Sequence, residues 1–303
     1  MQRVVSIVGP TGVGKSALAL KLADDFKGEV ISADSRQIYK MLDIGTAKPT
    51  VMEQKLTPHH LIDVVAPDQD FSLAQYQQQA YQAIDDISTR GKLPLLAGGS
   101  GLYVWAVLEG WRIPRVAPDS TLRRELEARA AGGEAAQLFA ELQQLDTEAA
   151  ARIDSRNVRR VIRALEIQHH PEEVAAPSKV SPPFESMIIG LTCSRELLYE
   201  RIDQRVEAMM QQGLVDEVKG LIEKGYVAEL PSMSGIGYRQ IAAYLSGTIS
   251  LTDATQQIKY ESHRLARQQY NWFSLKNDTI HWFDVTENYY NDLHRLVINF
   301  LKV

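Results

Sequence analysis

Short apolar runs alternate with longer amphipathic stretches along most of the chain. Residues 4–8, 29–33, 93–97 and 187–192 have the length and composition of buried strands, and a last strand is expected from Ile280. Ser72 followed by Gln75 forms a helix-start pattern, and apolar residues at helical spacing continue it to Ile87. Further helices are expected at 195–212 and 252–273, with one closing the chain. This alternation predicts an α/β fold built on a parallel sheet.

The middle of the chain has a different character. From about Trp111 to Pro183 no strand-like run occurs, and Ala, Glu, Gln and Arg dominate until a proline-rich segment at 177–183. We therefore predict an all-helical insertion at 113–184, which returns through a stiff linker to a core formed by 1–112 and 185–303.

A glycine-rich loop joins the first strand to the first helix and fits the phosphate-loop pattern of P-loop NTPases and kinases. Its glycines let backbone N–H groups surround an anion, and the helix N-terminus adds its dipole. Lys15 adds a positive charge, and Ser16 is expected to place a hydroxyl on Mg²⁺. The pattern indicates a phosphate or diphosphate ligand without choosing between them. The loop consists of Gly9, Pro10, Thr11, Gly12, Val13, Gly14, Lys15 and Ser16.

Other polar residues follow strand ends or re-enter beside this loop. Asp34 follows the second strand, and either caps a helix at 35–39 or offers a carboxylate to take a proton or hold magnesium through water. Ser100 lies in a glycine turn after the third strand. It either donates a hydrogen bond to phosphate or is an ordinary serine of the turn. Arg201 and Arg205, four residues apart on one helix face, either reach the ligand or pair with neighbouring acids.

Basic residues gather on predicted helix faces although the net charge is −5, which argues against indiscriminate nucleic-acid binding. Five arginines between 152 and 163 fall opposite an apolar stripe, with Asp154 as the only acid in that interval. Lys259, His263 and Arg267 form a second basic face, opposite Ile258, Leu265, Ala266, Trp272 and Phe273. The pattern favours contacts with a phosphate backbone, against a solvated face. The small-residue loop at 230–239 could lie against a sugar–phosphate chain.

Cysteine content and hydropathy set the broad class. The single cysteine, Cys193, excludes an internal disulfide framework and a cysteine-rich zinc site, and reads as a small hydrophobic residue at a strand end. Too few residues precede the phosphate loop for a signal peptide, and no apolar run approaches membrane-spanning length. We therefore expect a cytoplasmic protein.

At several of these segments the chain resembles the tRNA dimethylallyltransferases, also called tRNA isopentenyltransferases. The phosphate loop alone is weak support. The run Asp34-Ser35-Arg36-Gln37, the block 43–49 and the turn 98–103, in this order, are specific to the family. Further matches lie at 58–63, 163–166 and 236–239, and more loosely at 269–273.

The resemblance implies that a dimethylallyl group moves from dimethylallyl diphosphate to N6 of the adenosine 3′ of the anticodon in tRNA. It implies a P-loop kinase-like core whose loop holds diphosphate, Mg²⁺ at Ser16, and Asp34 as the general base. Thr11, Lys15 and Arg205 would hold the diphosphate, with Arg205 counted as catalytic. The partners are the tRNA anticodon stem-loop and the donor, and a monomer is expected. The residues implied to contact tRNA are Asp34, Ser35, Arg36, Gln37, Ser100, Arg123, Arg159, Arg160, Val161, Ile162, Arg163, Ser234, Gly235, Ile236, Gly237, Tyr238 and Arg239.

The chain departs from the family pattern in two places. After Ile167 the usual Thr-Gly turn is replaced by residues 168–173, and the segment 267–274 carries two positive charges fewer than the family's usual sequence. We expect weaker or rearranged backbone contact there, with the chemistry retained.

Two other functions fit part of the sequence. A small-molecule or nucleotide kinase would use the same loop for ATP, but it explains the arginine-rich segment poorly. A non-catalytic RNA-binding module with a vestigial loop would bind tRNA without forming product.

Overall fold

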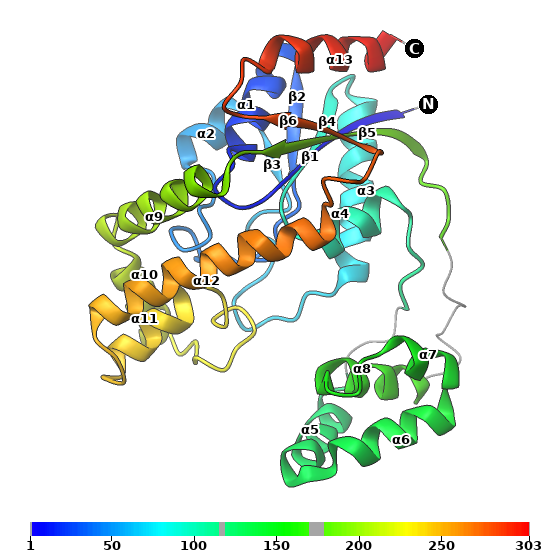
Figure 1. The fold of residues 1–303 in the computed structure, drawn as a ribbon, viewed down its shortest axis with the longest axis vertical. Coiled ribbons are helices and arrows are strands. Elements are labelled where there is room, and N and C mark those ends of the chain that lie inside the picture. Colours follow the sequence, from blue (N-terminus) through cyan, green and yellow to red (C-terminus); the bar gives the residue numbers. More distant parts are fainter. Residues whose placement is uncertain (1, 115–118, 170–178, 303) are drawn as a thin grey trace. The chain divides into compact units, whose positions relative to one another are not determined.

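The computed structural model describes residues 2–114, 119–169 and 179–302. The chain divides into two compact units (Figure 1). One, here called the core unit, comprises Met1–Gly110 and Ser181–Val303, and the other, the insertion, comprises Trp111–Val180. The sequence pattern predicts the insertion at 113–184, but Phe184 already begins a strand of the core unit. Part of the predicted linker, residues 177 and 178, and part of the departing segment, 170–173, lie outside the described residues.

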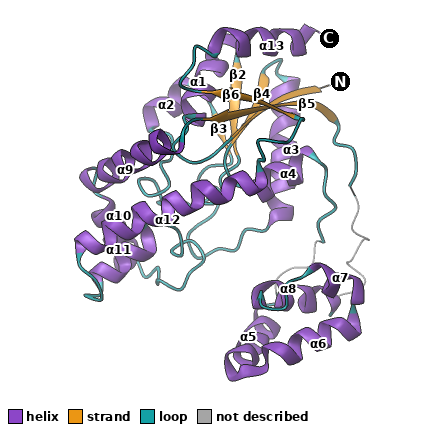
Figure 2. Cartoon of the chain, in the orientation of Figure 1, coloured by secondary structure: helices purple, strands orange, loops and turns teal. Residues whose placement is uncertain are grey.

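Within the described residues, the core unit contains a six-stranded sheet with the order β3-β2-β4-β1-β5-β6, and every pairing is parallel. Figure 2 shows the strands side by side among the helices. The strands are β1 Gln2–Val8, β2 Gly28–Ser32, β3 His59–His60, β4 Leu93–Ala97, β5 Phe184–Thr192 and β6 Ile280–Asp284. A parallel sheet buried on both faces requires near-continuous apolar runs, which is why β1, β2, β4 and β5 could be found in the sequence.

Side chains along a strand alternate between the two faces of the sheet, and on each face they pack into a different hydrophobic cluster. Val4 and Val8 of β1 pack with α3 Leu73–Thr89 and α4 Gly101–Leu108. Val5 and Ile7 pack with α1 Lys15–Phe26 and α13 Tyr290–Lys302. The apolar runs therefore serve two layers of helices, one on each face.

A further group of helices extends the core unit beyond the strand ends (Figure 1). The long helix α12 Leu251–Trp272 contacts both α9 Arg195–Gln211 and α11 Tyr238–Leu245. Helix α10 Leu214–Glu223 contacts α9 and α11, and the short helix α2 Val51–Leu56 lies between β2 and β3 in the chain. None of the described helices is both long and apolar enough to cross a membrane.

The described part of the insertion is helical, with α5 Ser120–Arg129, a π-turn at Ala130–Glu134, α6 Ala135–Leu145, α7 Thr147–Arg152 and α8 Val158–Gln168. Its own small core includes Leu126, Leu138, Leu142 and Leu165. One prediction here was wrong. The arginines between 152 and 163 do not share one helix, because α7 ends at Arg152 and Asn157 caps a new helix by accepting from the N–H of Arg160.

One of the two alternatives for Asp34 was also wrong. Residues 35–38 form turns and Tyr39 forms an isolated bridge with Val65, so Asp34 caps no helix there. His59 and His60 form the edge strand β3, where His60 Nε2 lies 2.8 Å from Glu29 Oε2. Cys193 directly follows β5 as expected, and it is half-buried.

Candidate functional site

The phosphate loop joins β1 to α1 at the carboxyl edge of the sheet. Gly9, Gly12 and Gly14 have φ values of 140°, 84° and 109°, which residues with a Cβ rarely adopt. A Cβ on Gly9 would lie 2.5 Å from the carbonyl oxygen of Leu191, and one on Gly12 would lie 2.9 Å from Ile202 Cγ1. The glycines therefore allow both the turn and its close contact with β5 and α9.

Three cationic side chains surround this loop. Lys15 Nζ donates to the Pro10 carbonyl oxygen (2.8 Å), Arg205 Nη1 donates to Thr11 Oγ1 (3.3 Å), and Arg201 Nη1 lies 3.5 Å from the Val13 carbonyl oxygen. α9 thus brings both arginines to the loop. Of the two alternatives that the sequence leaves open, this agrees with arginines that reach the ligand, and not with arginines that pair with neighbouring acids. The geometry therefore concentrates positive charge around the phosphate loop, where it would favour an anion.

Burial and neighbouring charges alter two of these groups. Removal from water lowers the pKa of Lys15 to about 8, with Asp34 opposing the decrease and Arg205 adding to it. Desolvation also lowers the pKa of Arg205, again opposed by Asp34. The carboxylate is therefore close enough to both cations to interact with them electrostatically.

Asp34 lies two residues after the end of β2. Its Oδ1 accepts from the N–H of Arg36 (2.9 Å), which fixes the carboxylate in a tight turn. The N–H of Ser35 donates to Ser100 Oγ (3.0 Å), so the turn after β4 supports the turn after β2. The carboxyl ends of neighbouring parallel strands have thus placed Asp34 and Ser100 on one edge, as expected.

A cavity of about 540 Å³ opens beside these groups. Thr11, Asp34, Ser100 and Arg205 form part of its polar lining. The apolar lining comes mainly from α9 and α12, together with the start of α4. Its members include Leu102, Ile202, Val206, Ile258, Leu265 and Trp272. The cavity can therefore hold a molecule that has both an anionic and a hydrocarbon part.

The loop after α10 forms another side of this cavity. Arg36 Nη1 donates to the Pro231 carbonyl oxygen (2.6 Å), and Ser234 to Arg239 line the cavity, as does the Asp34 turn. Tyr238 is only 1% exposed, and its hydroxyl donates to Glu217 Oε1 (2.6 Å). Arg239 Nη2 lies 3.3 Å from Glu261 Oε2. The structure thus brings the predicted segments 34–37 and 234–239 together with Ser100.

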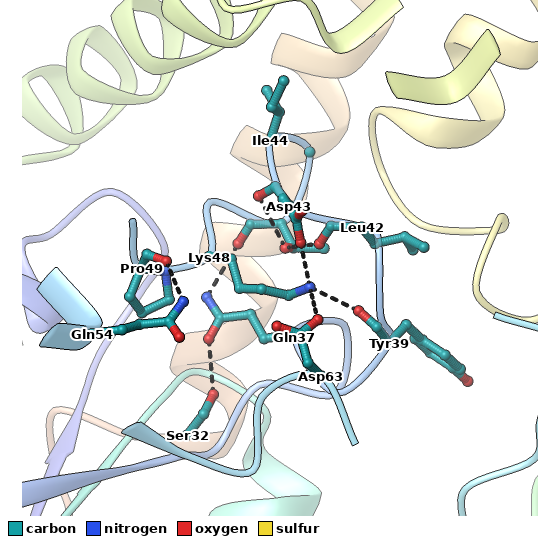
Figure 3. A network of polar contacts seen from close by, with 12 residues as sticks. Ser32, Gln37, Tyr39, Leu42, Asp43, Ile44, Lys48, Pro49, Gln54 and Asp63 are labelled. Atoms are coloured by element: carbon teal, nitrogen blue, oxygen red, sulfur yellow. Dashed lines mark hydrogen bonds and ion pairs between the residues drawn. The ribbon is translucent and has the colours of Figure 1, made fainter. Parts of the chain in front are cut away.

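The turn at 43–48 is held by a network of polar contacts (Figure 3). Gln37 Nε2 donates to the carbonyl oxygens of Thr46 and Ala47, both at 3.2 Å, while Gln37 Oε1 accepts from Ser32 Oγ (2.9 Å). Lys48 Nζ donates to a backbone carbonyl and two carboxylates, and its side chain is only 3% exposed. The Gln37 amide is therefore engaged within the protein and anchors this turn beside Asp34.

Two residues that sequence reasoning did not single out also hold the cavity walls. The Glu217 carboxylate accepts from three consecutive backbone N–H groups, those of Asp43 (3.0 Å), Ile44 (2.7 Å) and Gly45 (3.2 Å). Gln269 is 7% exposed and bonds to both the phosphate loop and the turn after β4. For Gln269 a signal existed, since it opens the loosely matched segment 269–273, but Glu217 lies in an ordinary amphipathic helix.

The predicted nucleic-acid contacts of the insertion fall into different environments. Arg159 and Arg160 are exposed, whereas Val161 and Ile162 are only 1% and 4% exposed and pack in the insertion's core. Arg123 forms a bidentate pair with the fully buried Glu166. The side chains of Val161 and Ile162 therefore support the helix instead of forming a contact surface.

The second basic face was predicted incorrectly. Lys259 Nζ lies 2.6 Å from Glu207, His263 Nε2 lies 2.8 Å from Asp203, and Arg267 Nη1 donates to the Tyr199 hydroxyl (2.6 Å). These partners all come from α9, so most of the basic charge of α12 is used in packing against it. Leu265 and Trp272, expected to face inward, are 38% and 37% exposed and line the cavity.

The donor groups near the loop suit magnesium held mainly by a substrate. Among the described residues, no cluster of three His, Cys, Asp or Glu side chains could hold a metal ion. Mg²⁺ in phosphate sites commonly takes one or two protein oxygens and completes its shell with water and phosphate oxygens. The exposed hydroxyl of Ser16 at the start of α1, with Asp34 as a candidate for contact through water, fits that chemistry.

Comparisons with known proteins agree on one family. The model of the IPP transferase family matches residues 37–277. The tRNA dimethylallyltransferase of Dehalococcoides mccartyi is 51% identical over 97% of this chain and 91% of its own length. The tRNA isopentenylpyrophosphate transferase of Bacillus halodurans, a crystal structure, superposes with a TM-score of 0.72 at 39% identity, covering 100% of this chain and 96% of its own. A eukaryotic dimethylallyltransferase acting on tRNA gives 0.81 at 26% identity, covering 98% and 78%.

Proposed function

Because the chain belongs to the IPP transferase family and is a transferase that prenylates tRNA, we propose that its donor is dimethylallyl diphosphate and its acceptor is N6 of the adenosine 3′ of the anticodon. The observation that carries this proposal is the single cavity in which Thr11 and Arg205 lie with Asp34 and an apolar wall. Such a cavity suits a short hydrocarbon attached to a diphosphate. Because the acceptor is tRNA, we also propose that the reaction takes place in the cytoplasm.

The cationic loop would stabilise the leaving group. As the allylic C–O bond breaks, its electron pair leaves with the diphosphate, whose charge increases in the transition state. Lys15, Arg205 and the loop's N–H groups would lie around that charge. Magnesium bound at Ser16 would supply additional neutralisation. The hydrogen bond from Arg205 to Thr11 would orient the guanidinium toward this charge.

Asp34 would act on the nucleophile. The exocyclic N6 amine forms the new C–N bond and must lose one proton, which the Asp34 carboxylate accepts. The tight turn with Arg36 and the contact between Ser35 and Ser100 orient this carboxylate toward the cavity lining. The adenine must leave the anticodon-loop stack to reach it, and an unpaired loop base makes this less costly.

RNA binding would use the exposed part of α8. Arg159 and Arg160 are exposed at the start of that helix and can contact the phosphate backbone. Arg36 and the segment 234–239 line the cavity and would contact the nucleotides around the extruded base. Gln37 would act indirectly, through the turn that it anchors.

The decisive experiment uses purified protein, radiolabelled dimethylallyl diphosphate, magnesium and an unmodified tRNA transcript. We expect label in the tRNA, and a decrease in kcat of about 10²–10⁴-fold in Asp34→Asn with tRNA binding retained. Asp68→Asn, an exposed carboxylate outside the cavity lining, should match the unaltered protein. Turnover of ATP without label transfer would overturn the proposal in favour of a kinase, and tRNA binding without product would favour a binding module.

A further inference from the structure

Gln269 connects two segments of the cavity that are far apart in the sequence. It lies in the last turn of α12, and its side chain is almost fully buried. Its Oε1 accepts from the N–H of Thr11 (2.7 Å), and its Nε2 donates to the carbonyl oxygen of Gly99 (3.0 Å). One amide group therefore bonds to the phosphate loop with one end and to the turn after β4 with the other.

The fit around this amide is close. A Cβ at Gly99 would lie 2.2 Å from Gln269 Nε2, so the turn can approach the amide only because residue 99 is glycine. Trp272, three residues after Gln269, covers Gly101 in the same way. A Cβ on Gly101 would lie 2.2 Å from Trp272 Cγ. Trp105 Nε1 also donates to the Trp272 carbonyl oxygen (3.0 Å). The end of α12 is thus fixed on the turn, and the position of the Gln269 amide is determined by packing.

Each segment held by Gln269 carries a group proposed to act on one substrate. Thr11 Oγ1 accepts from Arg205, on the side where the diphosphate would bind. Gly99 precedes Ser100, whose Oγ accepts from the N–H of Ser35 beside Asp34. The distance between the donor's diphosphate and the proposed base therefore depends on how these two segments are held relative to each other.

We propose that Gln269 is a positioning residue that sets the phosphate loop and the Asp34 turn at the separation that prenyl transfer requires. This inference rests on the proposed function. Gln269 need not touch the reacting atoms, because it acts through Thr11 and through Ser100. Reacting groups displaced by about 1 Å can lose on the order of 10²-fold in rate, so a side chain in this position can control kcat.

Gln269→Met tests the proposal because methionine has a similar length but neither polar end. We expect kcat for prenyl transfer to decrease by about 10–100-fold, while the KM for tRNA changes by less than about 3-fold. Gln257→Met, an exposed glutamine on the same helix and outside this cavity, should have unchanged kinetics. Melting temperatures of both variants report whether the fold is intact.

Gln269→Glu provides a readout that a purely structural role would not change. Its ionised carboxylate could still accept from Thr11 but could not donate to Gly99, whereas the protonated acid could do both. Burial raises the pKa of such a carboxyl group, so the ratio of its kcat to that of the unaltered protein should rise from about pH 8 to about pH 6. Lys15, Asp34 and Arg205 border the same cavity, and for this reason the unaltered protein is measured at each pH.

The outcomes separate the two proposals. If the unaltered protein transfers the prenyl group but folded Gln269→Met keeps its kcat, or the Gln269→Glu ratio does not depend on pH, Gln269 is not a positioning residue. If the unaltered protein transfers nothing, the proposed function itself is wrong.

Discussion

Arg123 gives the sharpest test of what holds the insertion together. The Glu166 carboxylate on α8 is fully buried, and Arg123 on α5 binds it with two hydrogen bonds, Nε to Oε1 (2.9 Å) and Nη2 to Oε2 (2.8 Å). Arg163 Nη1 also lies 3.3 Å from Oε2. The family resemblance implies that Arg123 contacts tRNA, but its guanidinium joins two helices. We therefore expect Arg123→Ala to destabilise the insertion.

The magnitude follows from the burial of the two partners. Removing one member of a buried ion pair costs about 3–5 kcal/mol, because the other charge is left without compensation. The Arg123 side chain is 35% exposed and Arg163 remains beside Glu166, so we expect about 2–3 kcal/mol. A unit the size of Trp111–Val180 holds roughly 4–10 kcal/mol in total, and the loss would be a large part of it.

Amide hydrogen exchange on the whole protein measures this effect, with peptides of α6 and α8 reporting on the insertion and peptides of β1 and β4 serving as internal reference. The matched control is Arg156→Ala, since Arg156 also pairs with a carboxylate, Asp154, but the two side chains are 88% and 53% exposed. That control should leave amide exchange almost unchanged, because an ion pair in contact with water contributes little to stability. Equal exchange in the two variants would refute the reasoning from buried charge.

Three further results are expected. The KM for the diphosphate donor should rise as pH increases through about 8, because desolvation lowers the pKa of Lys15 to that value and the neutral amine attracts the anion less; a flat profile would contradict this. Exchanging both Arg159 and Arg160 for Ala should weaken tRNA binding and reduce its dependence on salt concentration. If the salt dependence of the binding constant did not change, the two arginines would face solvent and not the tRNA. Gly45→Ala should lower kcat and the melting temperature together, because its Cβ would lie 2.5 Å from the Tyr238 ring; normal values of both would show that the wall can relax.

The core of the fold could be predicted because β1, β2, β4 and β5 are mostly buried on both faces and so appear as apolar runs. The helix starting at Leu73 was predicted through its capping box, in which Ser72 and Gln75 satisfy each other's backbone N–H groups. The edge strand at His59–His60 carries no such signal, since two residues cannot display a period. In the insertion, the apolar spacing continues across Asn157, and so the sequence concealed the break between α7 and α8.

The acidic and basic residues show where reasoning from one sequence fails. Lys259 and His263 look unpaired along α12, because their partners Glu207 and Asp203 lie on α9. A helical wheel counts charges on one helix and cannot include acids that arrive from a neighbour. In contrast, Arg201 and Arg205 are also on α9, yet they reach the phosphate loop. The same helix therefore presents cations to the loop and acids to α12, which only its tertiary position can distinguish.

The residues of the run 34–37 are consecutive in sequence but have different surroundings in the structure. Asp34 lines the cavity, whereas Gln37 bonds with both ends of its amide to the protein, at Ser32 and at the turn 43–48. Arg36 lines the cavity and also bonds to Pro231 in the loop opposite. The Gln37 amide is only partly buried, but it would still lose these internal bonds by turning toward a ligand, so the protein favours its present orientation. Asp34 at the cavity lining thus remains available for the role in proton transfer that we propose. Gln37 and Glu217 instead hold the turn 43–48 in place, as we propose that Gln269 holds the phosphate loop.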